Sequence, residues 1–280
     1  MRILNPVSAS TWQSLLARMS DKIKIYVAPG CGELTDRIEL SSGTRAAEIQ
    51  ATDEPVRGVS YEEGARLPRD PWRRPTEEEI TGLVMSERPS KMATSVVILK
   101  LPDELRDDLQ RIRSYPEFQD ILHDFRTVCE LGQPVHCIGP SRNPANLKTV
   151  TYNQDTRQYN GLHVDNWDQL DLESRHLATN RICVNIGQND RYFLFLPFSL
   201  MDIARALSDE MGSDWEPPGR PTVIGRQFME KYPEIPIVRC RLRPGEAYIA
   251  PTENLVHDGS SVGQGDIDRQ FTIRGHIRPL

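Results

Sequence analysis

The strongest constraint on the fold is a series of short apolar or alternating segments in the second half of the chain, separated by turn-forming residues. An alternation of period two buries one face of a strand, and many short strands with frequent turns are typical of a sandwich or jelly roll. The pattern predicts strands at residues 147–152, 161–165, 181–187, 192–196, 235–242, 246–250 and 269–277.

Helical periodicity indicates three helices in addition to these strands. After a strand-like segment at 95–101, apolar residues recur at helical spacing beyond Pro102 and again beyond Pro116. A third helix at 200–211 interrupts the strands. We expect the first two helices to pack on one face of a sheet. The fold class predicted from the residues is therefore α+β, with helices on the N-terminal side and a β-rich C-terminal half.

The first ninety or so residues have an irregular pattern, with Gly, Ser, Pro and charged residues scattered through them. The segment RLPRDPWRRP at 66–75 cannot continue a helix or a central strand. It is either a surface loop or part of a lid in which Trp72 is a packing anchor. We expect residues 1–93 to form an irregular N-terminal extension or lid, packed on a core of residues 94–280 within one structural domain.

Composition argues against several classes of partner. The formal net charge is −6, whereas nucleic-acid binding needs a basic surface. No apolar segment approaches the roughly 18 residues needed to cross a bilayer, and the N-terminus lacks the apolar core of a signal peptide. The five cysteines include no Cys-x-x-Cys pair, which favours reduced thiols. We expect a cytoplasmic protein without nucleic-acid or membrane partners, and a homodimer is left open.

A His-x-Asp motif lies in GLHVD at 161–165, a segment with strand character. On a strand, His163 and Asp165 point to the same face. A distal histidine would complete two imidazoles and one carboxylate, a set that covers one side of an octahedral metal and leaves positions open for other ligands. His257 is the candidate, because it follows the strand EAYIAP and a short link, as a ligand at a strand end would. A lone His-x-Asp arises often by chance, so the prediction depends on the whole set.

The last predicted strand carries two arginines, Arg269 and Arg274. They differ by five positions and so face opposite sides of a regular strand, and at most one of them can enter a pocket beside the metal. A buried guanidinium there would bind a carboxylate through two hydrogen bonds. The alternative is that both arginines face solvent.

These motifs resemble those of the Fe(II)/2-oxoglutarate-dependent oxygenases. The match consists of His163-x-Asp165, His257 within PGEAYIAPTENLVHDGSS, and an arginine about a dozen residues later, and it is most similar to the phytanoyl-CoA-hydroxylase-like branch. It covers about residues 147–279. The resemblance implies a double-stranded β-helix core, jelly-roll or cupin-like, buttressed by the helices. It also implies that an arginine binds 2-oxoglutarate, and the spacing of the branch favours Arg269 over Arg274.

The resemblance further implies an Fe(II) site at His163, Asp165 and His257, with 2-oxoglutarate as cosubstrate and O2 as oxidant. Decarboxylation of 2-oxoglutarate to succinate would accompany hydroxylation of an unactivated C–H bond in a small molecule, such as an amino acid or a natural-product intermediate. Desaturation, epimerisation and ring formation use the same ligands and stay open. So do two other functions, a cupin-type metal enzyme that does not use 2-oxoglutarate and a non-catalytic jelly-roll binding protein.

The candidate substrate contacts are the three residues that directly follow the metal motif, Asn166, Trp167 and Asp168. Trp167 is placed to cover a substrate, and Asp168 to pair with a cationic group. The alternative is that they only cap the strand and fill space.

Overall fold

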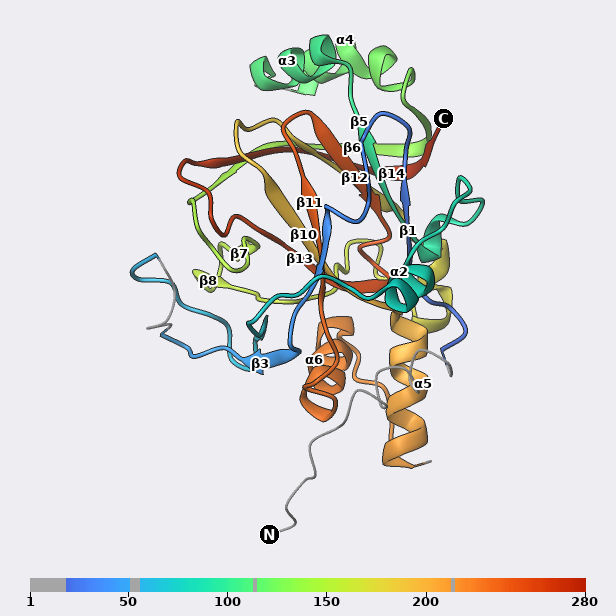
Figure 1. Ribbon diagram of the computed structural model, residues 1–280, viewed down its shortest axis with the longest axis vertical. Coiled ribbons are helices and arrows are strands. Elements are labelled where there is room, and N and C mark those ends of the chain that lie inside the picture. Colours follow the sequence, from blue (N-terminus) through green and yellow to red (C-terminus); the bar gives the residue numbers. More distant parts are fainter. Residues whose placement is uncertain (1–18, 51–55, 113–114, 213–214) are drawn as a thin grey trace.

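The computed structural model describes residues 19–50, 56–112, 115–212 and 215–280. Its strands form two main sheets, and helices pack against the outer faces of these sheets (Figure 1). The protein is therefore of the mixed α+β class, with more sheet than helix, which confirms the class predicted from the sequence.

The larger sheet has six strands. In the order in which they lie side by side, these are β1 (Lys24–Val27), β5 (Ser95–Lys100), β12 (Glu246–Ala250), β9 (Asn180–Asn185), β14 (Asp268–Pro279) and β6 (Cys129–Asn143). Only β1 and β5 run parallel, and all other neighbours are antiparallel.

The smaller sheet has four antiparallel strands, in the order β13 (Leu255–Ser260), β10 (Arg191–Ser199), β11 (Val238–Leu242) and β2 (Ile38–Leu40). Two short pairs complete the strands, β3 (Thr44–Ala46) with β4 (Arg66–Pro68) and β7 (Tyr152–Asn153) with β8 (Gln158–Tyr159). From β9 to β14 the chain passes repeatedly between the two main sheets, so side chains from both sheets meet in one interior.

That interior is apolar over most of its length. Phe193 of the smaller sheet stacks on Tyr248 of the larger one, with ring centroids 4.0 Å apart. The same cluster contains Val96, Ile98, Cys183, Phe195, Val238, Cys240 and Leu255. Since successive strand residues point to opposite faces, the alternating pattern of these strands supplies both this core and the apolar outer faces under the helices.

Two helix pairs cover the outer faces. α3 (Asp103–Arg111) and α4 (Tyr115–Phe125) pack on the larger sheet, where Phe118 lies 5.9 Å from Phe271 between ring centroids. α5 (Leu200–Met211) and α6 (Pro221–Lys231) pack on the smaller sheet. The remaining helical elements are α2 (Glu77–Leu83) and the short 3-10 helices η1 (Met92–Thr94) and η2 (Leu172–Leu177). The expected placement of the first two predicted helices is confirmed.

Several sequence expectations about individual elements are wrong. The segment 161–165 forms one isolated bridge instead of a strand, and most of 147–152 is irregular. β13, α6 and the long strand β6 were not expected. β6 contains two prolines and two glycines and is largely exposed at the edge of its sheet, so it lacks the alternation that marks a half-buried strand.

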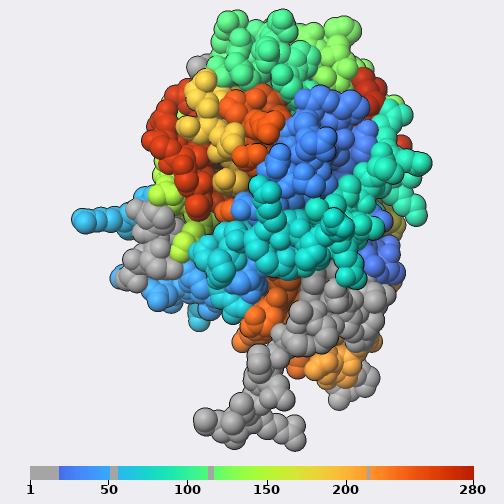
Figure 2. Space-filling view, in the orientation of Figure 1, coloured from blue at the N-terminus to red at the C-terminus, as the bar shows by residue number. Residues whose placement is uncertain are grey.

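Residues before 94 are more ordered than the sequence predicts. They supply β1 to the larger sheet and β2 to the smaller one. In the space-filling view, residues of this part of the chain (blue to teal) cover much of the visible face (Figure 2). A boundary at residue 93 therefore divides both sheets, and the described part of 1–93 is not an irregular extension. Residues 1–18 lie outside the described residues.

Within the described ranges, no helix is long and apolar enough to cross a membrane. All five cysteines are free thiols, in agreement with the prediction from their spacing.

Candidate metal centre

Backbone pairing brings the two histidines together. His257 is the third residue of β13, opposite Phe195 of β10, so it lies inside a strand and not at a strand end as the sequence suggests. On its other side, His163 and His257 exchange two backbone hydrogen bonds, with N–O distances of 3.0 and 2.7 Å. In a hydrogen-bonded antiparallel pair of this kind the two side chains lie on the same face.

The predicted metal ligands converge. Nε2 of His163 lies 3.6 Å from Oδ1 of Asp165, and Nε2 of His257 lies 3.8 Å from Oδ2 of the same carboxylate. Ligand atoms about 2.0–2.2 Å from a metal ion lie about 3 Å apart when they occupy adjacent positions. The side chains are 2–8% exposed. This buried group, in which all three ligand atoms lie within 4.8 Å of one another, could hold a metal ion.

The hydrogen bonds of the two rings prepare their Nε2 atoms for a cation. Nδ1 of His163 lies 2.9 Å from the carbonyl of Gly161, and Nδ1 of His257 lies 3.3 Å from the carbonyl of Leu255. A carbonyl only accepts, so each Nδ1 carries a proton, and Nε2 is the ring nitrogen left to bind a metal ion. Both Nε2 atoms are buried without a hydrogen-bond partner among the described residues. Such atoms are costly unless something binds them, so the group fits a metal.

Arg181 is the cation nearest to the ligand carboxylate. Its guanidinium lies 2.7 Å from Oδ2 of Asp165. Burial alone would raise the pKa of Asp165, but Arg181 and the two imidazoles outweigh it and hold this pKa well below its usual range. Asp165 is therefore an anion across the physiological pH range, as a metal ligand must be.

The two imidazoles differ in proton affinity. Burial would lower the pKa of His163, but the Asp165 and Asp258 carboxylates outweigh burial and raise it to about 10. Burial lowers the pKa of His257 to about 4. Without a metal ion, His163 therefore holds a second proton, beside Asp165, and His257 does not. A bound metal ion would replace that proton.

Asp258 supports His163 from behind. Its Oδ1 accepts hydrogen bonds from the backbone and hydroxyl of Thr151, at 3.1 and 2.9 Å, while its Oδ2 lies 3.6 Å from Nδ1 of His163. A carboxylate in this position orients a ligating imidazole and strengthens it as a donor. Sequence reasoning assigned no role to Asp258, although it directly follows His257.

The two arginines of β14 lie on opposite faces of the strand, and Arg274, not Arg269, is the buried one. Arg269 is exposed and lines a small recess with Gln110 and Arg142, on the strand face opposite to the metal centre. Arg274 is buried and lies directly opposite Arg181 on the neighbouring strand β9. Residues two apart share a face of a strand, so Arg269 lies on the outer face of the sheet, the face on which Phe271 packs against the helices.

Arg274 already has carboxylate partners. Its guanidinium donates to Asp168 at 2.8 Å, to the hydroxyl of Thr179 at 2.7 Å and to Glu253 at 3.3 Å. Asp168 also accepts from the backbone of Thr179, at 2.6 Å. The expected cationic partner of Asp168 therefore belongs to the protein itself.

The other two residues after the metal motif lie at the surface. Trp167 is 60% exposed, and its ring lies 5.1 Å from the Arg274 guanidinium. Asn166 is exposed and accepts a hydrogen bond from Arg175. An exposed tryptophan beside a buried metal centre remains a candidate for substrate contact.

Arg175 and Glu253 complete the surroundings of the site, and sequence reasoning missed both. Arg175 donates to the backbone carbonyl of Asp165 at 3.1 Å and to that of Glu253 at 2.9 Å. The Glu253 carboxylate, fully buried, accepts from the backbone of Trp167 at 2.8 Å. Both residues lie in segments without a sequence pattern, so only the fold reveals them.

Comparison with known proteins adds no relative. No protein-family model matches the chain, and no curated protein matches it.

Proposed function

We propose that this protein is a non-haem Fe(II)/2-oxoglutarate-dependent oxygenase that hydroxylates a C–H bond of a small molecule. The observation that carries the proposal is the buried convergence of His163, Asp165 and His257, with two Nε2 atoms that have no partner among the described residues. Two imidazoles and one carboxylate with open positions are the donor set of this class of iron enzyme. The exchange of strands between two facing sheets, from β9 to β14, supports a double-stranded β-helix core.

Each residue of the site has a defined task in this proposal. The carbonyls of Gly161 and Leu255 keep the two Nε2 lone pairs directed at the metal position. Arg181 fixes one oxygen of Asp165 and so orients the carboxylate. When bound, Fe(II) supplies the electrons for O2 activation, coupled to decarboxylation of 2-oxoglutarate.

Arg274 is the cation that we assign to the far carboxylate of 2-oxoglutarate. It is buried beside Arg181, on the strand face directed at the metal centre. Asp168 and Glu253 hold it now, so a cosubstrate carboxylate would replace one of their hydrogen bonds. Exchange between two carboxylates keeps the guanidinium paired throughout and avoids an isolated buried charge.

A second candidate is a metal-dependent enzyme of the cupin type that does not use 2-oxoglutarate. It is favoured by the pairing of the buried arginines near the triad: Arg181 with Asp165, Arg274 with Asp168 and Glu253, and Arg175 with Glu253. Because each of these three arginines already has a carboxylate partner, the site suits a substrate without a second carboxylate.

The decisive experiment is an anaerobic titration of metal-free protein with Fe(II) and then 2-oxoglutarate, which follows the weak visible charge-transfer band of the chelate. The first proposal predicts a saturable band that is lost in His257→Ala and kept in His123→Ala, whose histidine is exposed on α4. It also predicts succinate formation that depends on Fe(II). Fe(II) binding without a band, together with unchanged activity in Arg274→Met, would favour the second candidate. Succinate formation that persists in both His163→Ala and His257→Ala would refute the proposal.

A further inference from the structure

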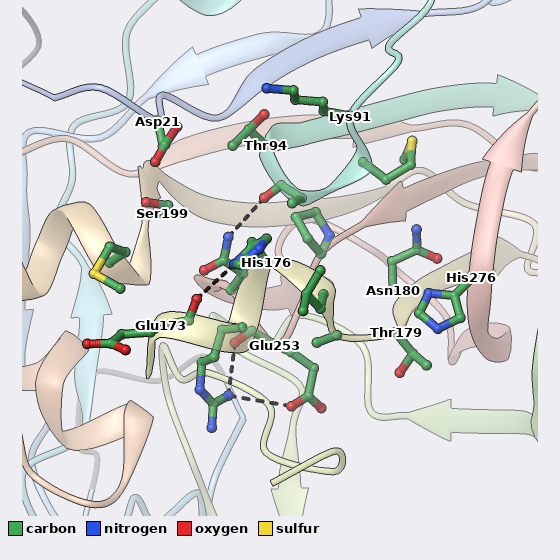
Figure 3. A pocket seen from close by; sticks show the side chains of 18 of the residues that line it. Asp21, Lys91, Thr94, Glu173, His176, Thr179, Asn180, Ser199, Glu253 and His276 are labelled. Carbon is green, nitrogen blue, oxygen red and sulfur yellow. Dashed lines mark hydrogen bonds and ion pairs between the residues drawn. The ribbon is translucent and has the colours of Figure 1, made fainter. Parts of the chain in front are cut away.

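A cavity of about 710 Å³ lies between η1, η2, the beginning of α5 and the end of β14 (Figure 3). Its charged lining residues are not separated by sign, because Lys91 lies on the same side as Asp21 (Figure 3). Arg205 also lines it and pairs with Asp202. The charges of this cavity therefore select no class of ligand. A smaller recess, on the outer face of the larger sheet, carries charge of one sign.

This smaller recess has a volume of about 170 Å³ and lies between α3, the beginning of β14 and the end of the edge strand β6. The amide of Gln110 on α3 donates to the carbonyl of Ile186 at 2.8 Å, which ties the helix to the sheet at this point. The residues that line the recess are Gln110, Pro140, Ser141, Arg142, Ile186 and Arg269. Within this lining, only the two guanidinium groups are charged.

The two arginines lie directly opposite each other in the sheet. Arg142 of β6 and Arg269 of β14 are antiparallel partners, and both side chains are exposed. Partners in an antiparallel pair lie on the same face, with Cβ atoms about 4.5–5.5 Å apart, and like charges in this position destabilise the sheet. An anion held between the two guanidinium groups would relieve this repulsion.

The protein itself does not neutralise this pair. Among the residues that the structure describes, neither guanidinium has a hydrogen-bond or ion-pair partner. Asp107 and Asp108 of α3 are each paired with an arginine of their own helix. Asp268 precedes Arg269 in the sequence, but it pairs with Arg191 on the other face of the strand. Two positive charges are thus available to a ligand at the recess.

We propose that this recess binds a phosphate group between Arg142 and Arg269. Each guanidinium presents two parallel N–H donors, which match two oxygens of a phosphate. A carboxylate has one charge and two oxygens, which a single guanidinium satisfies, whereas a phosphate dianion has the charge and the oxygens for both. The phosphate is either free or the end group of an organic ligand. The site lies away from the metal centre and does not depend on the proposed function.

The test is calorimetric titration of the full metal-free chain with inorganic phosphate, phenyl phosphate and acetate, at constant ionic strength and above neutral pH, where phosphate is mainly a dianion. We expect saturable binding of phosphate in the millimolar range. Acetate should bind at least about tenfold more weakly, because it lacks the second charge and leaves one guanidinium without a partner. Phenyl phosphate should bind at least as tightly as phosphate if the recess takes a phosphorylated ligand, and more weakly if it takes free phosphate.

Single substitutions locate the binding site. Arg142→Gln and Arg269→Gln each remove one guanidinium and should weaken phosphate binding at least about tenfold. Arg142→Lys keeps the charge but loses the paired donors, so it should weaken binding as well. Arg126→Gln is the matched control and should bind phosphate like the parent, since Arg126 is exposed on the turn after α4 and does not line the recess.

Urea unfolding shows that the variants are folded and tests the repulsion between the two arginines. Without phosphate, Arg142→Gln should unfold at a urea concentration equal to or above that of the parent, because a repulsive pair is removed. Saturating phosphate should raise the midpoint of the parent and of the Arg126→Gln control, but not that of Arg142→Gln. No saturable binding of phosphate at millimolar concentration, equal binding of acetate, or the same loss in Arg126→Gln would each overturn the proposal.

Discussion

The buried ion pair between Arg191 and Asp268 predicts a large stability effect outside the metal centre. Nε of Arg191 lies 3.0 Å from Oδ1 of Asp268, and both side chains are 1% exposed. Burial alone would lower the pKa of Arg191, but the Asp268 carboxylate outweighs it and raises this pKa. Replacing Asp268 with Asn would leave the guanidinium charged and buried with only neutral partners, the Asn side chain among them. Breaking a buried pair in this way costs about 3–5 kcal/mol, a large share of the 5–15 kcal/mol that stabilises a typical domain.

The assay is urea unfolding at equilibrium, followed by circular dichroism, for the parent chain, the single variants Asp268→Asn and Arg191→Met, and the double variant Arg191→Met/Asp268→Leu. We expect each single variant to lose about 3–5 kcal/mol and the double variant to regain most of it, because an apolar pair carries no desolvation penalty. The exposed pair of Arg111 and Asp108 is the control, and Asp108→Asn should cost under about 1 kcal/mol. A loss below about 1 kcal/mol in Asp268→Asn would contradict the assignment of a buried, charged pair.

Three further predictions concern the metal centre, the cap of α2 and the packing of α6 on β13. Arg181→Gln should weaken Co(II) binding about 10–100-fold, because the ligand carboxylate loses its orienting partner; an unchanged titration would disprove this role. Glu79→Gln should cost about 1 kcal/mol at neutral pH, because Glu79 completes a capping box and pairs with Arg73. Burial would raise the pKa of Glu79, but Arg73 and the cap hold it below 4.5. The contribution of Glu79 to the free energy of unfolding is therefore complete above pH 4.5. It should vanish as the pH is lowered further, which urea unfolding at a series of pH values would measure. Gly225→Ala should cost about 1–3 kcal/mol, since its Cβ would meet a valine methyl of β13 at 2.6 Å, whereas Gly82→Ala, with open space around it, should cost nothing.

The candidate metal-binding group was predictable because the spacing of its residues is typical of metal ligands. His163 and Asp165 form a His-x-Asp motif, which indicates two candidate ligands. The turn and strand that precede His257 indicated the third. The apolar periodicity of the helix at 200–211 likewise predicted α5 with the bounds that the structure has. Patterns of this kind are local, and local patterns survive folding when the fold also requires them.

The groups that tune the metal centre were not predictable, because they meet only through long-range contacts. Arg181 reaches Asp165 from β9, and Glu253 reaches Arg274 from a turn. Sequence spacing also does not state which face of β14 points inward, so it could not show that Arg274 is buried and Arg269 exposed. That face is set by the apolar residues that α3 and α4 bury, which include Phe271 on the side of Arg269.

The metal centre also depends on strand register more than on loop structure. His257 sits between two backbone partners, with Phe195 on one side and His163 on the other, so its side chain is fixed by hydrogen bonds on both edges of β13. A slip of one residue in either pairing would turn His257 to the opposite face and replace it with Asp258 or Val256. The same register places Asp258 behind His163, so that one pairing positions both a ligand and the carboxylate that orients another ligand. The spacing of the two imidazoles is therefore set by backbone pairing.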